Sequence, residues 1–151
     1  SRHTRNQFEK AIMRLEAQDV PLTIMFGHSH DAMAAADAAL VASGTATLEA
    51  ALLKCPMVIA YKMSPLTYRI MKRKAYLPYV GLPNILAGEF IVPELLQDDA
   101  TPRNLATALV NLLQQPRLRG LMVNKFTAMH HSVRQNNAAK LAQAILPYFP
   151  R

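Results

Sequence analysis

The sequence predicts an α/β fold, a Rossmann-like parallel sheet flanked by helices. Three observations predict it: short apolar segments alternate with helical segments, the apolar segments are continuous, and helix-starting residues follow them. Continuous apolar strands are typical of a parallel sheet whose two faces are both covered by helices. With 151 residues, of which 51% are hydrophobic, the chain has about the length of one domain and can bury a sizeable core.

The first half of the chain supplies the predicted strands. Each strand is a short apolar segment, and the third helix ends before Pro56 because a proline disfavours helical geometry in the residue before it. The predicted elements are, in order, a helix over 2–17, a strand over 21–26, a short helix from Asp31, a strand over 37–42, a helix ending near Lys54 and a strand over 57–61.

Helices are predicted on either side of an irregular connection in the second half. Ser64 and Pro65 are a cap and a first-turn proline, and they start a helix that runs to about Tyr76. Residues 78–100 are rich in proline and glycine, so they predict an irregular connection of the kind that often carries function. Thr101 and Pro102 repeat the cap signal and open a helix to about Gln115.

The last predicted helical segment follows a break at Pro116 and covers residues 118–145. Its predicted inward contacts are Leu121, Phe126, Met129, Val133, Leu141 and Ile145.

The chain begins with a predicted helix, whereas a nucleotide-binding α/β domain normally begins with a strand. It also lacks an initiating methionine. We therefore expect a piece of a longer polypeptide whose sheet is incomplete at its N-terminus, with a helical C-terminal tail.

The net charge and the cysteine content indicate the kind of partner and the cellular compartment. Seventeen basic and ten acidic residues give a net charge of +7, which favours anionic partners such as phosphates, nucleic acid or acidic lipid headgroups. Cys55 is the single cysteine, which excludes an internal disulfide and favours a reduced, cytoplasmic setting. The sequence contains neither a membrane-spanning segment nor the apolar region of a signal peptide.

The segment ASGTATLEAAL, residues 42–52, is the first candidate site. Ser43, Gly44 and Thr45 follow a predicted strand, and ligands of open parallel sheets lie beyond the carboxyl ends of the strands. Free backbone N–H groups and the helix dipole favour a phosphate there, and Gly44 permits close approach of the backbone.

Glu49 extends this candidate site. Thr45 and Glu49 are four residues apart, so they share one face of the predicted helix. A carboxylate about one turn behind a bound diphosphate can accept both hydroxyls of a ribose. The pattern leaves open a simpler interpretation, in which Ser43 caps the helix and Glu49 is solvated.

Other sites are excluded or left open. The five glycines spell neither G-x-G-x-x-G nor a Walker loop, and VASGT lacks the G-x-S-x-G nucleophile motif. His28, His30 and Asp31 lie close in sequence, but without a third ligand at an established spacing no metal is predicted. His28 follows a predicted strand and remains a candidate ligand contact. His130 and His131 are expected on a helix surface.

Basic residues gather between 62 and 74, interleaved with apolar ones. This composition is typical of a helix that lies on an anionic membrane surface, and an ordinary amphipathic helix with a solvated basic face is the alternative. Nucleic acid is not predicted as a partner, because no recognised binding module is present. The basic residues are Lys62, Arg69, Lys72, Arg73 and Lys74.

Two segments carry a family resemblance: ADAALVASGTATLEAALLKCPMVIAYKMSPLTY and YVGLPNILAGEFIVPELLQ. They resemble the C-terminal half of bacterial lipid-A-disaccharide synthases, which are glycosyltransferases of the GT-B architecture. The resemblance covers most of the chain and is strongest over 36–97. It is specific because S-G-T-A-T-x-E, L-P-N-x-L-A-G and P-E-L-L-Q occur in this order and spacing.

The resemblance implies a reaction and a location. The family transfers 2,3-diacylglucosamine from UDP-2,3-diacylglucosamine to lipid X (2,3-diacylglucosamine 1-phosphate), giving lipid A disaccharide 1-phosphate and UDP. It works as a peripheral protein on the cytoplasmic face of the inner membrane and requires no metal or other cofactor.

The resemblance also implies roles for particular residues. Residues 1–100 correspond to a partial Rossmann-like UDP-sugar-binding domain, and 101–151 to helices that pack on it or on a missing half. That missing half is expected to hold the acceptor and the catalytic residues, so these residues alone are expected to be inactive; a homo-oligomer remains open. The donor-binding candidates are Ser43, Gly44, Thr45, Thr47, Glu49, Asn84 and His28, with Glu94 and Gln97 as secondary candidates.

Two other classes remain open at this point. One is a related GT-B enzyme, either a peptidoglycan N-acetylglucosaminyltransferase or a UDP-sugar 2-epimerase, against which the segments LPNILAG and PELLQ argue. The other is a non-catalytic, basic anion-binding module.

Overall fold

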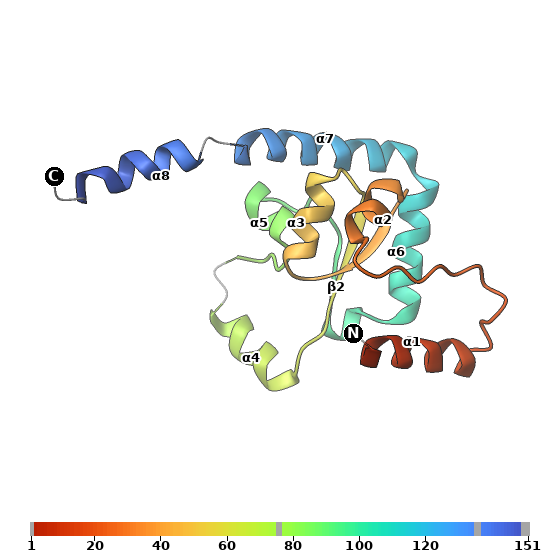
Figure 1. Cartoon of the computed structure of the whole chain (residues 1–151). Helices are drawn as coiled ribbons and strands as arrows, with labels where there is room; N and C mark the ends of the chain where they lie inside the picture. The colour runs from red at the N-terminus through yellow and green to blue at the C-terminus, as the bar shows by residue number, and fades with distance from the viewer. Residues whose placement is uncertain (1, 75–76, 135–136, 149–151) are drawn as a thin grey trace.

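The computed structural model describes residues 2–74, 77–134 and 137–148, of which 2–3, 71–74 and 137–138 are described by their backbone alone. Helices surround a small parallel sheet (Figure 1). The elements are α1 (Arg2–Arg14), α2 (Ser29–Ala35), β1 (Ala39–Ala42), α3 (Thr45–Leu52), β2 (Met57–Tyr61), α4 (Pro65–Lys74), α5 (Leu82–Ala87), β3 (Glu94–Leu96), a 3-10 turn η1 (Gln97–Asp99), α6 (Pro102–Gln114), α7 (Pro116–Val133), α8 (Asn137–Ile145) and a 3-10 turn η2 (Leu146–Tyr148).

The sheet has the strand order β1-β2-β3, and both strand pairs are parallel. Ala39 of β1 pairs with Met57 of β2, and Ile59 of β2 pairs with Glu94 of β3. The central strand is apolar throughout because helices cover both of its faces, and its first three residues are fully buried. The predicted fold class, a Rossmann-like parallel sheet flanked by helices, is confirmed.

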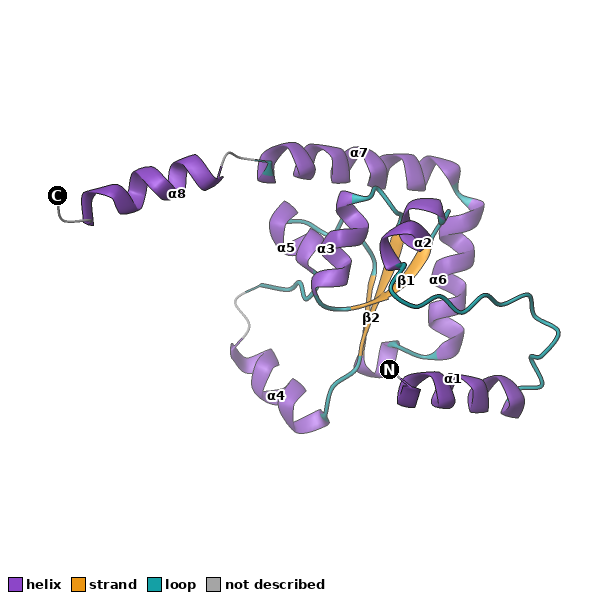
Figure 2. Cartoon of the chain, viewed as in Figure 1, coloured by secondary structure: helices purple, strands orange, loops and turns teal. Residues whose placement is uncertain are grey.

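Figure 2 shows the sheet between α3 on one side and α6 on the other. Helix α6 packs against β1 and β2, and α3 packs against β1 and α5. Helix α7 runs across α3, α5 and α6 and so closes one end of the core. The largest buried apolar side chains of this core are Met57, Val58, Ile59, Val92, Leu112 and Phe126.

The strand predicted over 21–26 is wrong. These residues lie in an exposed connection between α1 and α2, and the side chains of Leu22, Ile24 and Phe26 are exposed. The third strand of the sheet is instead β3, three residues long, from within the segment predicted to be irregular. An apolar segment becomes a strand only where a neighbouring strand pairs with it, and a strand as short as β3 carries no periodic signal.

Helix α5 also lies within the segment predicted to be irregular. Gly81 precedes its first turn, a proline lies within that turn, and Gly88 ends it in a left-handed conformation with φ of 70°. Glycine is the residue that adopts this conformation without strain, which is why it commonly ends helices. Three of the residues that suggested an irregular loop, Gly81, Pro83 and Gly88, therefore mark the ends of a short helix.

The predicted helices of the second half are confirmed within the described residues; Tyr76, the predicted end of the first, lies outside them. Their buried faces need a correction. Phe126 and Met129 are buried and Val133 is half-buried, but Leu121, Leu141 and Ile145 are exposed, so those three inward contacts are wrong. The buried residues of α7 are Met122, Phe126 and Met129, which recur at helical spacing. The segment divides into α7 and α8, and α8 extends away from the sheet (Figure 1).

Candidate functional site

The turn between β1 and α3 lies at the carboxyl end of the sheet. The backbone N–H of Ser43 donates to the carbonyl of Ala60 on the neighbouring strand (3.1 Å), which ties this turn to β2. Gly44 follows with φ of 149° and ψ of −166°. A Cβ at Gly44 would meet open space, so this position favours glycine because of its backbone conformation and not because of crowding.

The first turn of α3 is open to a ligand. Gly44 occupies the cap position, and among the described residues no side chain caps the helix. The hydroxyl of Ser43 lies 3.5 Å from the carbonyl of Val80, so the simpler interpretation in which Ser43 caps the helix is not what the structure shows. The first N–H groups of a helix have no acceptor within the helix, and together with the helix dipole they attract an anion.

Thr47 holds this turn in shape. Its side chain is fully buried. The Thr47 hydroxyl donates to the carbonyl of Gly44 (2.7 Å), and the Thr47 backbone N–H donates to the same carbonyl (3.1 Å). The predicted contact between Thr47 and the UDP-sugar stays a prediction. Its hydrogen bonds to Gly44 are observed.

Glu49 lies one helical turn after Thr45 and is half-exposed. Its Oε2 lies 3.0 Å from Nε2 of His30, which belongs to α2. Sequence reasoning weighed His30 as a metal ligand and missed this contact, because no periodic pattern links two residues 19 positions apart. The structure therefore joins two exposed segments, the start of α2 and the first turns of α3, into one polar site.

His28 is at the edge of this site. Its Nδ1 lies 3.1 Å from Oδ2 of Asp31, and both side chains are exposed. Within the part of the chain that the structure describes, no three histidine, cysteine, aspartate or glutamate side chains are grouped as metal ligands would be.

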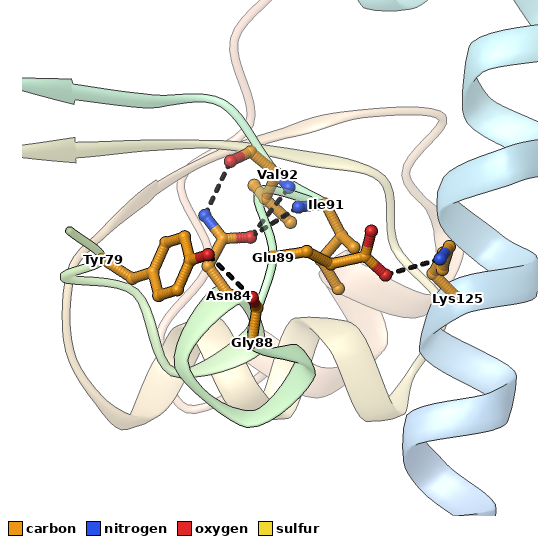
Figure 3. Close-up of polar contacts among 7 residues, drawn as sticks. All are labelled: Tyr79, Asn84, Gly88, Glu89, Ile91, Val92 and Lys125. Atoms are coloured by element: carbon orange, nitrogen blue, oxygen red, sulfur yellow. Dashed lines mark hydrogen bonds and ion pairs between the residues drawn. The ribbon is translucent and has the colours of Figure 1, made fainter. Parts of the chain in front are cut away.

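Asn84 is fully buried, and Figure 3 shows its amide facing the backbone of Ile91 and Val92. Its Nδ2 donates to the carbonyl of Val92 (2.8 Å) and to Oε1 of Glu94 (2.7 Å). Its Oδ1 accepts from the backbone N–H groups of Ile91 and Val92, both at 2.9 Å. An amide side chain has two donors and two acceptor lone pairs, so all four are used. The predicted contact between Asn84 and the UDP-sugar stays a prediction. Such a contact would have to replace one of these four hydrogen bonds.

Glu94 connects this amide to the loop before α5. Its carboxylate accepts from the backbone N–H groups of Val80 (2.9 Å) and Gly81 (2.8 Å) in addition to Asn84. A Cβ at Gly81 would lie 2.3 Å from Cδ1 of Ile59, so the loop approaches the sheet more closely than a side chain would allow. Because Val80 also faces Ser43, Glu94 fixes the loop that borders the open turn.

Two further side chains, Gln97 and Tyr79, brace the loops of this region. Gln97 accepts from the backbone N–H of Met63 (2.7 Å) and donates to its carbonyl (3.1 Å), which joins the ends of β2 and β3. The hydroxyl of Tyr79 donates to the carbonyl of Gly88 (2.7 Å) and so closes α5 back onto the loop (Figure 3).

Helix α4 projects from the body next to this edge (Figure 1). Lys62 before the helix and Arg69 within it are exposed, and so are the apolar side chains of Leu66 (69%) and Ile70 (49%). The side chains of Lys72, Arg73 and Lys74, also predicted to face a membrane surface, lie outside the described residues. Among the described helices, none has the length and apolar character needed to cross a bilayer.

The parallel sheet, the covering helices and the open turn at the strand ends define the class: a Rossmann-like α/β half of the GT-B kind. The family model of lipid-A-disaccharide synthetases matches residues 1–145. The chain belongs to this family.

Individual relatives agree with this assignment. The chain is 58% identical over 148 residues to the lipid-A-disaccharide synthase of Azoarcus sp., covering 98% of this chain and 38% of that protein. It is 58% identical over 146 residues to that of Dechloromonas aromatica, and 61% identical over 125 residues to that of Burkholderia vietnamiensis, covering 32% of the latter. The chain thus spans about two fifths or less of the length of these relatives.

Proposed function

We propose that the open turn, Ser43 to Glu49, binds the UDP part of a UDP-sugar donor. The observation that carries this proposal is the uncapped start of α3 at Gly44, with the Glu49 carboxylate one turn behind it. The diphosphate accepts hydrogen bonds from the backbone N–H groups of Gly44 and Thr45, and the Ser43 hydroxyl borders it. The carboxylate of Glu49 accepts the ribose hydroxyls.

The intact protein then transfers 2,3-diacylglucosamine from UDP-2,3-diacylglucosamine to lipid X, giving lipid A disaccharide 1-phosphate and UDP. Membership of the lipid-A-disaccharide synthetase family supports this reaction. The role of this chain is to stabilise the negative charge that develops on the departing UDP, through fixed N–H donors and the helix dipole. The remainder of the protein binds the acceptor and supplies the group that deprotonates its hydroxyl.

The remaining donor-site candidates act at different distances from the ligand. His28 is exposed at the start of α2, whose His30 contacts Glu49, and it is available for a direct contact. Asn84 and Glu94 act from behind, because their bonds hold the loop against which Ser43 rests. Gln97 acts likewise through Met63 at the strand ends.

Helix α4 is the proposed contact with the anionic cytoplasmic surface of the inner membrane. Exposed apolar side chains next to Lys62 and Arg69 support it, since such a helix buries its apolar face among lipids while its cations face the headgroups. Replacing Leu66 and Ile70 together with serine is expected to reduce binding to vesicles that contain phosphatidylglycerol. Unchanged vesicle binding by this variant would contradict the proposal.

Calorimetry with UDP and with ADP tests the nucleotide site in the intact protein. Glu49→Ala is expected to weaken UDP binding about tenfold or more, the range for hydrogen bonds to a charged group. Glu89→Ala is the matched control, because Glu89 is a similarly exposed glutamate that pairs with Lys125 of α7 (Figure 3). Unchanged UDP affinity in Glu49→Ala would contradict the ribose contact, and equal affinity for UDP and ADP would favour a general anion-binding module.

A further inference from the structure

His30 and Glu49 form a contact that the proposed function alone does not require. Oε2 of Glu49 lies 3.0 Å from Nε2 of His30, and the two side chains are 42% and 67% exposed. An exposed pair of this kind contributes little to folding, since solvent screens the attraction and two flexible side chains lose freedom. The contact therefore affects the orientation of the Glu49 carboxylate more than the stability of the fold.

The element that carries His30 is itself anchored. Helix α2 packs against α3, and Met33 of α2 lies against the apolar core. The first turn of α2 is closed by a backbone bond from Ala32 to His28 and by the contact between the His28 ring and Asp31. The imidazole of His30 thus reaches Glu49 from a fixed backbone and not from a free loop.

The contact restricts a carboxylate that would otherwise sample several rotamers. A glutamate loses much rotamer freedom when a ligand orders it, and an existing hydrogen bond removes part of that loss before the ligand arrives. The contact occupies Oε2, and Oε1 has its lone pairs for a ligand hydroxyl.

We infer that His30 is a positioning residue, which orients the Glu49 carboxylate toward the ribose hydroxyls of the donor. This inference rests on the proposed nucleotide site. It assigns to the start of α2 a part in ligand binding that acts through Glu49 and not through direct contact with the nucleotide.

A double-mutant cycle in the intact protein tests this role, with UDP and 2'-deoxyuridine diphosphate as the probes. His30→Ala is expected to raise the Kd for UDP about two- to fivefold, the range for one exposed side-chain contact, with no change in Tm. The loss is expected to be smaller for the 2'-deoxy nucleotide, which lacks one of the hydroxyls. His30→Gln, whose neutral amide keeps an N–H donor at similar reach, is expected to restore UDP binding, and His131→Ala is the control histidine on α7.

The cycle separates the failure of this inference from failure of the nucleotide site. In the Glu49→Ala background, His30→Ala is expected to have no further effect. If Glu49→Ala weakens UDP binding but His30→Ala does not, the positioning role is wrong and the nucleotide site stands. Additive losses would mean that His30 acts independently of Glu49, and a lowered Tm without a change in Kd would mean a structural role; either result overturns the inference. If neither single variant changes UDP binding, the nucleotide site itself is wrong.

Discussion

Two polar clusters lie close together in this molecule, and they differ in how their hydrogen bonds are used. The inner network, formed by Asn84, Glu94 and the backbone groups that they contact, is closed: the buried amide uses all of its donors and acceptors within the chain. The open turn, residues 43–49, has an uncapped helix start and a half-exposed carboxylate.

The difference assigns stability to one cluster and ligand binding to the other. Buried polar groups cost free energy unless they are paired, so a closed network tolerates little change. An exposed helix start satisfies its N–H groups with water and can exchange that water for a ligand. The inner network holds the loop that borders the open turn, and so a rigid cluster supports an exchangeable one.

Removing the amide of Asn84 is expected to have the largest effect on stability. Asn84→Ala leaves the N–H groups of Ile91 and Val92 and the carbonyl of Val92 without their buried partner, at a cost of about 3 kcal/mol or more. Urea unfolding measures the change. Asn111→Ala, at an exposed position on α6, is the control and is expected to change the free energy of unfolding by less than about 0.5 kcal/mol. Equal losses of unfolding free energy in the two variants would contradict the stabilising role of the buried amide.

Adding a methyl group at Gly81 tests how tightly the loop is held against the sheet. The new Cβ would lie 2.3 Å from Cδ1 of Ile59 and 3.0 Å from Oε1 of Glu94, so Gly81→Ala is expected to destabilise the fold by about 1–3 kcal/mol. Gly120→Ala is the control of opposite sign, because Gly120 lies within α7 with open space around it and alanine favours the helix by up to about 1 kcal/mol. Thermal unfolding of both variants measures the two changes, and a stable Gly81→Ala protein would contradict the close packing.

Thr47 belongs to the open turn but is itself buried, so one substitution can affect both stability and ligand binding. Thr47→Val keeps the shape of the side chain and removes the hydroxyl bond to Gly44, with an expected loss of about 1 kcal/mol. Thr47→Ser keeps the hydroxyl and serves as the matched control for that bond. The two are compared by urea unfolding and by UDP titration. Thr47→Ser also removes a buried methyl group, so each variant is compared with the original protein. If Thr47→Val weakens neither stability nor UDP binding, the hydroxyl does not hold the turn.

The far end of α3 is closed, in contrast to its start, and this predicts a small pH effect. Lys54 donates to the carbonyl of Leu52 (3.0 Å) and lies 2.9 Å from Nδ1 of His130 on α7. The Lys54 ammonium, with burial and the neighbouring His131 and Arg134, lowers the pKa of His130 below its ordinary value of 6.5. The unfolded chain therefore binds this proton more readily than the folded one. Stability is expected to be full above about pH 6.5 and to fall as the pH decreases below it.

Unfolding free energies between pH 5 and 8 measure this effect by difference. His130→Gln is expected to flatten the part of the pH dependence that His130 contributes. Lys54→Met is expected to reduce it, because the main cause of the lowered pKa of His130 is removed. A pH profile identical in the original protein and in His130→Gln would contradict the assignment.

Elements with local signals could be predicted from the sequence. Strands β1 and β2 appear as continuous apolar segments, and Pro56, Pro102 and Pro116 mark where helices stop or start. The open turn was predicted for the same reason, since a strand end, a glycine and a helix start adjoin one another along the chain. The sequence motifs also suffice to predict the family.

The tertiary structure alone decided the features that depend on a partner distant in sequence. Residues 21–26 and 94–96 are both short segments, and the second became a strand because β2 lies beside it. Asn84 is buried because Val92 and Glu94 return over it, and Glu49 meets a histidine 19 residues away. Local sequence sets backbone geometry, whereas pairing and burial depend on which distant groups the fold brings together.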